Sequence, residues 1–171
     1  IEVMEPVRVL NLFTIMNRGG AETMVMNYYR KINRAKVQFD FLVHREEEGA
    51  YEQEIKDLGG RIYRMPPMYP QNFSLYKKKI REFFEEHKEY KIVHSHIDAM
   101  SYLPLRAAKK AGIPVRICHS HNSESQYSTS FLKKIMSRTY RIFMRKMIYK
   151  YSTNMLGCSE LANDYLYGEN W

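Results

Sequence analysis

Several features that would mark a membrane-spanning, secreted or disulfide-bonded protein are missing from this chain of 171 residues. No apolar run approaches the roughly 20 residues that a membrane span needs. The N-terminus has neither the basic start nor the apolar stretch of a signal peptide. The two cysteines, Cys118 and Cys158, lie in or at the end of strand-like runs, so we expect reduced thiols and a cytoplasmic protein. The chain begins at Ile1 and stops at Trp171, and we expect both ends to be cut from a longer protein.

Common catalytic and nucleic-acid signatures are also missing. The GxxxxGK[ST] loop of P-loop NTPases does not occur, and the G-x-G-x-x-G spacing of dinucleotide-binding enzymes is absent after the first apolar run. The chain has no Gly-x-Ser-x-Gly elbow of a hydrolase. No zinc finger or RNP signature is present, so we expect no nucleic-acid partner. The net charge of +8 by itself favours an anionic partner, which could be a nucleotide, a phospholipid or a nucleic acid.

Apolar runs alternate with segments of helical periodicity along the whole chain. Strands are predicted at 7–13, 37–43, 61–65, 91–96, 114–119 and 153–158, and helices at 20–33, 50–58, 74–88, 98–111, 130–150 and 159–167. Gly59, Gly60 and Gly112 stand where helices should end. This alternation predicts one α/β domain over residues 1–171, with a parallel, doubly wound sheet between two layers of helices. Ligands of such sheets gather beyond the carboxyl ends of the strands.

A double glycine follows the first predicted strand. The segment 17–23 reads Asn-Arg-Gly-Gly-Ala-Glu-Thr and opens an amphipathic stretch. Gly19 and Gly20 have no Cβ, so a ligand can approach their backbone closely. The helix that follows directs N–H groups and the positive end of its dipole to the same place. The segment therefore predicts a phosphate- or sugar-binding corner; the alternative is a plain strand–helix turn that binds nothing.

Four of the six histidines fall at the ends of two predicted strands that could lie close together: His94, His96, His119 and His121. These imidazoles could bind a phosphate or polarise a sugar hydroxyl near neutral pH. They could instead bind a metal, with an oxygen ligand from Asp98 or Glu124. A third interpretation makes His94 and His119 structural, with hydrogen bonds to backbone. We expect a functional His96 and no metal, because no carboxylate has firm metal-ligand spacing.

The last third of the chain holds a polar run and a basic segment. Residues 120–130 are predicted to form a loop over the strand ends. The segment 131–151 has seven Lys or Arg residues interleaved with apolar ones, and no Asp or Glu. This pattern favours contact with an anionic membrane surface, although a core-packed helix with a solvated basic face would look the same. The residues expected at the membrane are Lys133, Lys134, Arg138, Arg141 and Arg145. Ser159 is predicted to cap the final helix.

Four motifs, in this order, resemble those of the N-terminal half of GT-B glycosyltransferases of the retaining family 4, in the form found in bacterial capsule and exopolysaccharide enzymes. They are the Gly-Gly-Ala-Glu segment at 19–22, Val-His-Ser-His at 93–96, His-Ser-His-Asn-Ser at 119–123 and Gly-Cys-Ser-Glu at 157–160. The resemblance covers nearly the whole chain. It implies a Rossmann-like three-layer α/β/α domain with a mainly parallel sheet, and it implies that a C-terminal nucleotide-sugar domain is absent from this chain.

By this resemblance, the protein transfers a sugar from a nucleotide-sugar to a saccharide or lipid-linked acceptor, with retention and without a required metal or other cofactor. His96 matches the family histidine that contacts the transferred sugar or the acceptor. The other residues expected at the donor or acceptor are Gly19, Gly20, Glu22, His119, His121, Asn122, Ser159 and Glu160. We expect the protein to lie in the cytoplasm, peripheral on the inner face of the membrane. The 171 residues alone should be inactive, because donor binding needs the absent half.

Two other functions stay open on the residues alone. A metal-dependent hydrolase would use the two His-x-His pairs, and bound zinc or manganese near one per chain would favour it. A non-catalytic module would use the basic helix 131–151 as its main surface, and salt-sensitive liposome binding without any nucleotide-sugar effect would favour that.

Overall fold

The computed structural model describes residues 5–122, 131–169 and 171. In this part of the chain six strands form one sheet, in the order β3-β2-β1-β4-β5-β6, and every neighbouring pair is parallel. The strands are β1 (Val7–Phe13), β2 (Val37–Val43), β3 (Ile62–Arg64), β4 (Ile92–Ser95), β5 (Val115–Ser120) and β6 (Asn154–Gly157). The predicted parallel sheet is confirmed.

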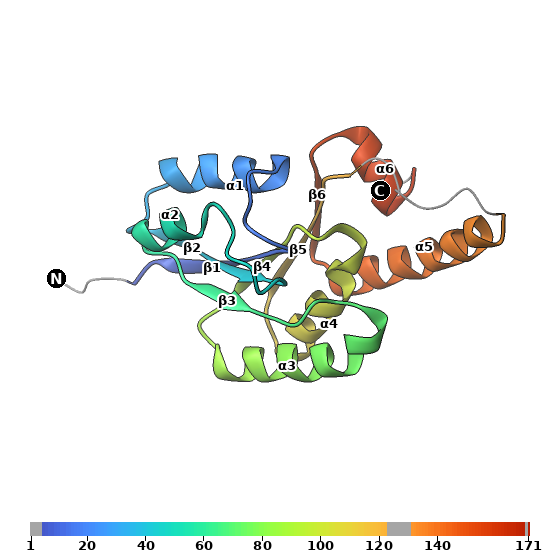
Figure 1. Cartoon of the computed structure of the whole chain (residues 1–171), viewed down its shortest axis with the longest axis horizontal. Coiled ribbons are helices and arrows are strands. Elements are labelled where there is room, and N and C mark those ends of the chain that lie inside the picture. Colours follow the sequence, from blue (N-terminus) through green and yellow to red (C-terminus); the bar gives the residue numbers. More distant parts are fainter. Residues whose placement is uncertain (1–4, 123–130, 170) are drawn as a thin grey trace.

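Helices cover both faces of this sheet (Figure 1). They are α1 (Gly20–Lys31), α2 (Glu52–Asp57), α3 (Phe73–Glu86), α4 (Tyr102–Lys110), α5 (Phe131–Tyr151) and α6 (Glu160–Tyr167), with short 3-10 turns at Pro70–Asn72 and Asp98–Ser101. The helices α1 and α2 lie over one face, and α3 and α4 lie over the other, with α5 beside α4. This arrangement gives the three-layer α/β/α fold, with one apolar core on each side of the sheet.

Local sequence accounts for most element boundaries. The α2 helix is followed by Gly59 with φ of +91°, and α4 is followed by Gly112 with φ of +80°, both in the left-handed region that favours glycine at a helix end. Ser159 caps α6 as predicted, because its Oγ accepts from the Ala162 N–H at 3.1 Å. The helix predicted at 98–111 differs: its first turn is the 3-10 turn at Asp98–Ser101, and Asp98 has φ of +47°.

The strand order places the chain's switch point between β1 and β4. The chain runs from β1 outward to β2 and β3, then returns to the opposite side of β1 to form β4. In sheets of this kind, ligands bind in the crevice beyond the carboxyl ends of the two strands that flank the switch point. Gly19 and Gly20 follow β1, and His96 follows β4. The fold therefore brings the double-glycine turn and the first histidine pair to the place where a ligand is expected.

Candidate functional site

The double glycine begins helix α1 without a side-chain cap. Gly19 is the N-cap residue, and its carbonyl oxygen accepts from the Thr23 N–H at 3.0 Å. Its φ is −87°, so this position does not require glycine for its backbone angle. What Gly20 provides is open space. A Cβ on Gly20 would meet no heavy atom within 4 Å, which leaves the first turn of the helix open to a ligand.

Glu22 occupies the space beside Gly19. A Cβ placed on Gly19 would lie 2.3 Å from Glu22 Oε2, so the carboxylate folds back over the N-cap. A negative charge here is favourable, because it meets the positive end of the helix dipole. It also takes the position where a phosphate would otherwise sit, so an incoming anion has its open approach at Gly20.

The register of β4 and β5 brings all four predicted histidines together. His94 pairs with Ile117 across the two strands, and the strand ends leave the imidazoles stacked at one edge. His94 Nε2 lies 3.1 Å from His119 Nδ1, and His96 Nδ1 lies 2.9 Å from His121 Nε2. The rings of His94 and His96 are 4.0 Å apart between centroids, as expected for residues two apart on one face. His94 and His119 therefore bond to each other, not to backbone as the structural interpretation supposed.

The tautomer of His96 follows from its second partner. Asn11 Nδ2 donates to the Val9 carbonyl at 3.5 Å, which turns the amide oxygen toward His96. His96 Nε2 donates to that oxygen at 3.3 Å. His96 Nδ1 is then the acceptor, and His121 Nε2 donates to it. Three side chains thus form one directed series of hydrogen bonds, in which His121 is the half-buried outer member and His96 is buried.

Burial keeps this cluster neutral at pH 7. Burial first, and the neighbouring imidazoles second, lower the pKa of His94 to about 3 and that of His119 to about 4. The pKa of His96 is well below its usual value for the same two reasons, and burial lowers the pKa of His121. Phe13 adds to the apolar environment, because its ring stacks on His96 with centroids 4.4 Å apart. Neutral imidazoles can each accept one hydrogen bond and donate another, as a sugar hydroxyl requires.

Asp98 holds the segment that carries His121 and Asn122. Its Oδ1 accepts from the His121 backbone N–H at 2.8 Å, and its Oδ2 accepts from Asn122 Nδ2. Burial raises the pKa of this carboxyl, and these hydrogen bonds oppose the rise. A non-glycine residue at φ of +47° carries strain of the kind that clusters at functional sites. Asp98 therefore positions the β5 motif; it is not oriented as a metal ligand.

The metal alternative has one observation in its favour. One ring nitrogen each from His94, His96 and His119 lies within 4.8 Å of the others. However, these nitrogens already bond to one another, to His121 and to Asn11. The two Asp98 oxygens accept hydrogen bonds from His121 and Asn122. Glu124, with the rest of residues 123–130, lies outside the described residues.

A brace behind the β1–α1 loop was not predicted. The Tyr51 N–H donates to the Met16 carbonyl and the Ala50 N–H donates to Asn17 Oδ1, each at 2.9 Å. Gly49 packs directly on this loop, because a Cβ there would lie 2.6 to 2.9 Å from three Met16 backbone atoms. Residues 49–51 thus support the segment that carries the double glycine.

An ion pair between a buried carboxylate and an exposed arginine fixes this brace. Glu52 is fully buried and accepts from both Arg64 terminal nitrogens, at 2.6 and 3.1 Å. It also accepts from the Gly49 N–H at 2.9 Å. Bidentate pairing of this kind sets orientation as well as energy. Neither Asn11 nor this brace was predicted from the sequence; the one available signal for Asn11 was a polar residue between the apolar residues Leu10 and Leu12.

The remaining predicted residues divide into two groups. Ser159 and Glu160 follow β6 and are exposed at the same edge of the sheet. On α5, Arg138 is exposed, and Arg141 is half-buried with its guanidinium 5.6 Å from the Tyr165 ring centroid. The side chains of Lys133 and Lys134 lie outside the described residues.

Arg145 has a different position from the one that the basic pattern indicated. Its guanidinium donates to the carbonyls of Asp164, Tyr165 and Leu166 at 2.9 to 3.2 Å. A cation at the last carbonyls of a helix satisfies acceptors that lack partners within the helix. Arg145 therefore serves the C-terminal end of α6, and its charge is turned inward rather than toward a membrane. Among the described residues, no helix has the length and hydropathy that crossing a bilayer requires.

Comparison with known proteins gives a matching family and two curated relatives. The family description "Glycosyltransferase Family 4" matches residues 18–168. The chain is 40% identical over 163 residues to the putative glycosyltransferase EpsF of Bacillus subtilis (strain 168), a match that covers 95% of this chain and 41% of EpsF. It is 29% identical over 163 residues to the capsular polysaccharide biosynthesis glycosyltransferase CapH of Staphylococcus aureus, covering 92% of this chain and 42% of CapH. The chain thus spans about two fifths of the length of these curated relatives.

Solved structures share the fold at low identity. Anabaena HepE in complex with UDP superposes with a TM-score of 0.64 at 13% identity, over 93% of this chain and 40% of HepE. Acinetobacter baumannii MurG superposes with a TM-score of 0.59 at 13% identity, over 90% of this chain and 41% of MurG. Both matches cover well under half of the larger protein, as the sequence relatives do.

Proposed function

We propose that this chain, which belongs to glycosyltransferase family 4, forms the acceptor-side half of an enzyme that transfers a sugar from a nucleotide-sugar. The observation that carries the proposal is that two features meet at the switch point: the open first turn of α1 follows β1, and the neutral histidine cluster lies at the carboxyl ends of β4 and β5. The first element suits a diphosphate, and the second suits the hydroxyl groups of a sugar or acceptor.

The chemistry follows from the charges that develop during transfer. As the sugar leaves, the diphosphate gains negative charge and the sugar ring gains positive charge. Preorganised N–H groups at the start of α1 stabilise the leaving diphosphate without reorganising. We assign the contact with the transferred sugar or acceptor to the His96–His121 pair: the more exposed His121 reaches the ligand, and His96, whose two ring nitrogens bond to His121 and Asn11, fixes the orientation of His121. His119 and Asn122 complete this side, and Glu22, Ser159 and Glu160 line the rest.

The proposal extends to the acceptor, the donor and the location of the protein in the cell. We infer that the acceptor is a saccharide, lipid-linked during capsule or exopolysaccharide synthesis, since EpsF and CapH are the curated relatives. A nucleotide-sugar donor is consistent with the UDP bound in the HepE structure. Transfer proceeds with retention, without a resident metal and without a nucleic-acid partner. The protein is cytoplasmic and peripheral on the inner face of the membrane, which it contacts through α5.

The test uses the full-length protein. UDP-, GDP- and ADP-sugars are screened for thermal stabilisation, and the best ligand is repeated with His96→Ala. We expect one nucleotide-sugar to stabilise both proteins, while His96→Ala loses transfer. His87→Ala is the matched control, because it removes a histidine at the end of α3, outside the candidate site. Absence of stabilisation by any nucleotide-sugar would overturn the donor assignment. Normal transfer by His96→Ala would overturn the role of that residue.

The isolated 171-residue chain is a separate test. We expect no transfer from it, because the half that should hold the nucleotide-sugar is not part of it. Measurable turnover with any donor would show that this half of the site suffices.

A metal-dependent hydrolase is the second candidate, favoured by the three imidazole nitrogens within 4.8 Å. Metal analysis of the purified full-length protein separates the two functions. Zinc or manganese near one per chain, with loss of activity on chelation, would support the hydrolase. We expect substoichiometric metal and activity that survives the chelator.

A further inference from the structure

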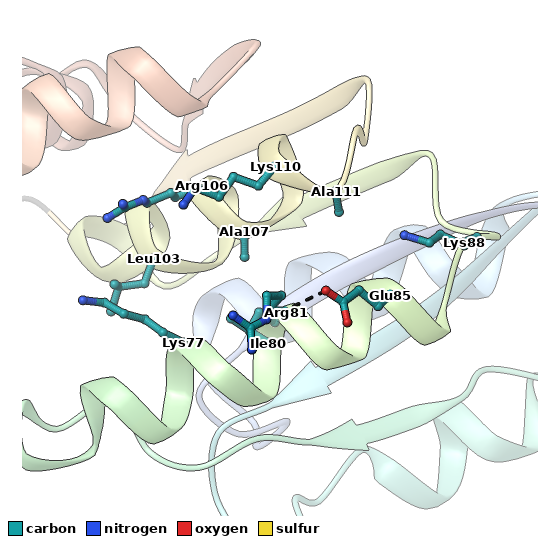
Figure 2. Close-up of a pocket in the computed structure, with 10 residues that line it drawn as sticks. All are labelled: Lys77, Ile80, Arg81, Glu85, Lys88, Leu103, Arg106, Ala107, Lys110 and Ala111. Atoms are coloured by element: carbon teal, nitrogen blue, oxygen red, sulfur yellow. Dashed lines mark ion pairs between the residues drawn. The ribbon is translucent and has the colours of Figure 1, made fainter.

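A groove of about 430 Å³ lies between α3 and α4, outside the site described above (Figure 2). It exists because α4 presents small side chains to α3. Ala107 and Ala111 are four residues apart, lie on one face of the helix, and point toward α3. Ile80 and Leu103 form an apolar floor and are almost fully buried. The groove is therefore apolar at its base.

The rim of this groove is cationic. Five basic residues line it: Lys77, Arg81, Lys88, Arg106 and Lys110. The one acidic lining residue, Glu85, forms an ion pair with Arg81, whose Nε lies 3.8 Å from Glu85 Oε1. Figure 2 shows Lys77 and Arg106 extending toward the same end of the groove from opposite helices. An apolar base under converging cations fits a ligand with a negative head group and an apolar continuation.

The positive charge of the chain is concentrated in α4, which forms one wall of the groove, and in the neighbouring α5. The segments that form α4 and α5 contain ten Lys or Arg residues and no acidic residue. The chain has 27 basic and 19 acidic residues, so the rest of it holds 17 against 19 and is slightly acidic. All of the net positive charge therefore belongs to these two helices. They lie side by side, since Lys109 Nζ donates to the Lys150 carbonyl at 3.0 Å.

Exposed apolar side chains accompany this charge. Ile142 and Phe143 are each 46% exposed on α5, and Phe143 packs edge-on against Tyr102 of α4. A soluble anion needs no such apolar surface, whereas a membrane offers anionic phosphates and an apolar boundary together. We propose that the α3–α4 groove is a head-group site for an anionic phospholipid of the bilayer, seated beside the membrane-facing surface of α5. This inference deepens the proposed membrane association by giving it a defined lipid site.

The experiment measures binding of the full-length protein to phosphatidylcholine vesicles with and without phosphatidylglycerol. Lys77→Gln/Lys110→Gln should weaken binding to the anionic vesicles roughly 25-fold, since each cation near an anionic surface contributes about a factor of five. Lys31→Gln/Lys36→Gln is the matched control, because it removes equal charge from two exposed residues, one at the end of α1 and one before β2, that do not line the groove. We expect this control to bind nearly as the unmodified protein does.

A second variant separates the groove from general surface charge. Ala107→Leu fills the groove and leaves every charge in place, so we expect it to weaken binding to phosphatidylglycerol vesicles by at least fivefold. Equal binding by this variant would overturn the head-group site, even if variants of α5 still showed membrane association. Displacement by inorganic phosphate, beyond that by chloride of equal ionic strength, would assign the groove to a soluble anion and also overturn the proposal. Nucleotide-sugar stabilisation should be unchanged in all three variants.

Discussion

Asn11 and His96 are 85 residues apart in the chain, yet Asn11 Oδ1 lies 3.3 Å from His96 Nε2. The contact crosses from β1 to the end of β4. The backbone N–H of His96 also donates to the Leu12 carbonyl, at 2.9 Å. The side-chain bond sets which ring nitrogen of His96 carries the proton. Asn11 therefore acts as a positioning residue for the His96–His121 pair.

Substitutions of Asn11 should show whether this residue positions His96 for catalysis or only stabilises the fold. Asn11→Leu leaves the His96 Nε2–H without its buried acceptor, which costs about 1–3 kcal/mol. We expect about a tenfold or greater loss of kcat with nucleotide-sugar binding retained. Asn11→Asp keeps the shape but adds a negative charge, so it should raise the pKa of His96 and move the acid limb of the pH–rate profile upward. An Asn11→Asp profile identical to the unmodified one would contradict this role.

Gly20 and Gly49 should respond in opposite ways to alanine. A Cβ on Gly20 meets nothing, and alanine favours a helix more than glycine by up to about 1 kcal/mol, so Gly20→Ala should fold at least as stably. It should nonetheless bind the nucleotide-sugar less tightly if the ligand approaches that backbone. Gly49→Ala forces the Met16 backbone to move and should lower both thermal stability and donor affinity. Titration calorimetry and melting curves of the two variants check this; unchanged donor affinity in Gly20→Ala would count against a ligand at the turn.

Acidification should destabilise the fold through its buried histidines. The pKa values of His44, His94 and His119 are lowered to about 4, 3 and 4, below the usual value of 6.5 that the unfolded chain retains. Above about pH 6.5 both states are neutral and nothing is lost. As the pH falls from there toward about 4, the unfolded state takes up protons that the folded state does not, so stability falls. Each histidine that stays neutral in the fold contributes a slope of up to about 1.4 kcal/mol per pH unit.

Urea unfolding at a series of pH values measures this slope. The double variant His94→Asn/His119→Asn removes two of the groups responsible, and its stability should depend less on pH. A slope equal to that of the unmodified protein would show that these two imidazoles are protonated in the fold.

Arg138 and Arg145 should differ although both lie in the basic stripe of α5. Arg145→Gln removes three hydrogen bonds to the end of α6 and should cost about 1–3 kcal/mol of stability. Arg138→Gln changes an exposed residue and should stay within about 0.5 kcal/mol. Chemical denaturation of the two variants measures the difference. Equal stability would show that Arg145 does not hold α6.

The membrane role of α5 is tested by charge reversal that spares Arg145. Lys133, Lys134, Arg138 and Arg141 changed together to Glu should abolish binding to anionic vesicles, because four attractions become repulsions. Sedimentation with vesicles at low and high salt is the measurement. Binding that persists in this variant would remove α5 from the membrane surface.

Local patterns predicted much of this fold because they depend on neighbouring residues. The apolar run of β1 and the Ser159 cap are decided within a few positions. The histidine cluster was predictable as well, since the carboxyl ends of neighbouring parallel strands must meet, and the expected proximity of the two His-x-His pairs is confirmed.

What escaped prediction depends on long-range contacts. Asn11 looks like any polar residue in a strand until β4 pairs with β1. Arg145 is indistinguishable from Arg138 in the basic run, because the turn of the helix that faces α6 is decided by packing. The strained Asp98 follows from the loop that it anchors rather than from its own type.

The division of charge between two helices and the rest of the chain makes the molecule an electric dipole. A dipole turns in the field of an anionic surface before any side chain touches it, so successive encounters begin with α4 and α5 leading. A protein that reaches the surface already oriented needs fewer encounters before it binds, and orientation usually limits the association rate. Added salt should therefore slow association with anionic vesicles more than it speeds dissociation, because screening shortens the range over which the dipole is oriented.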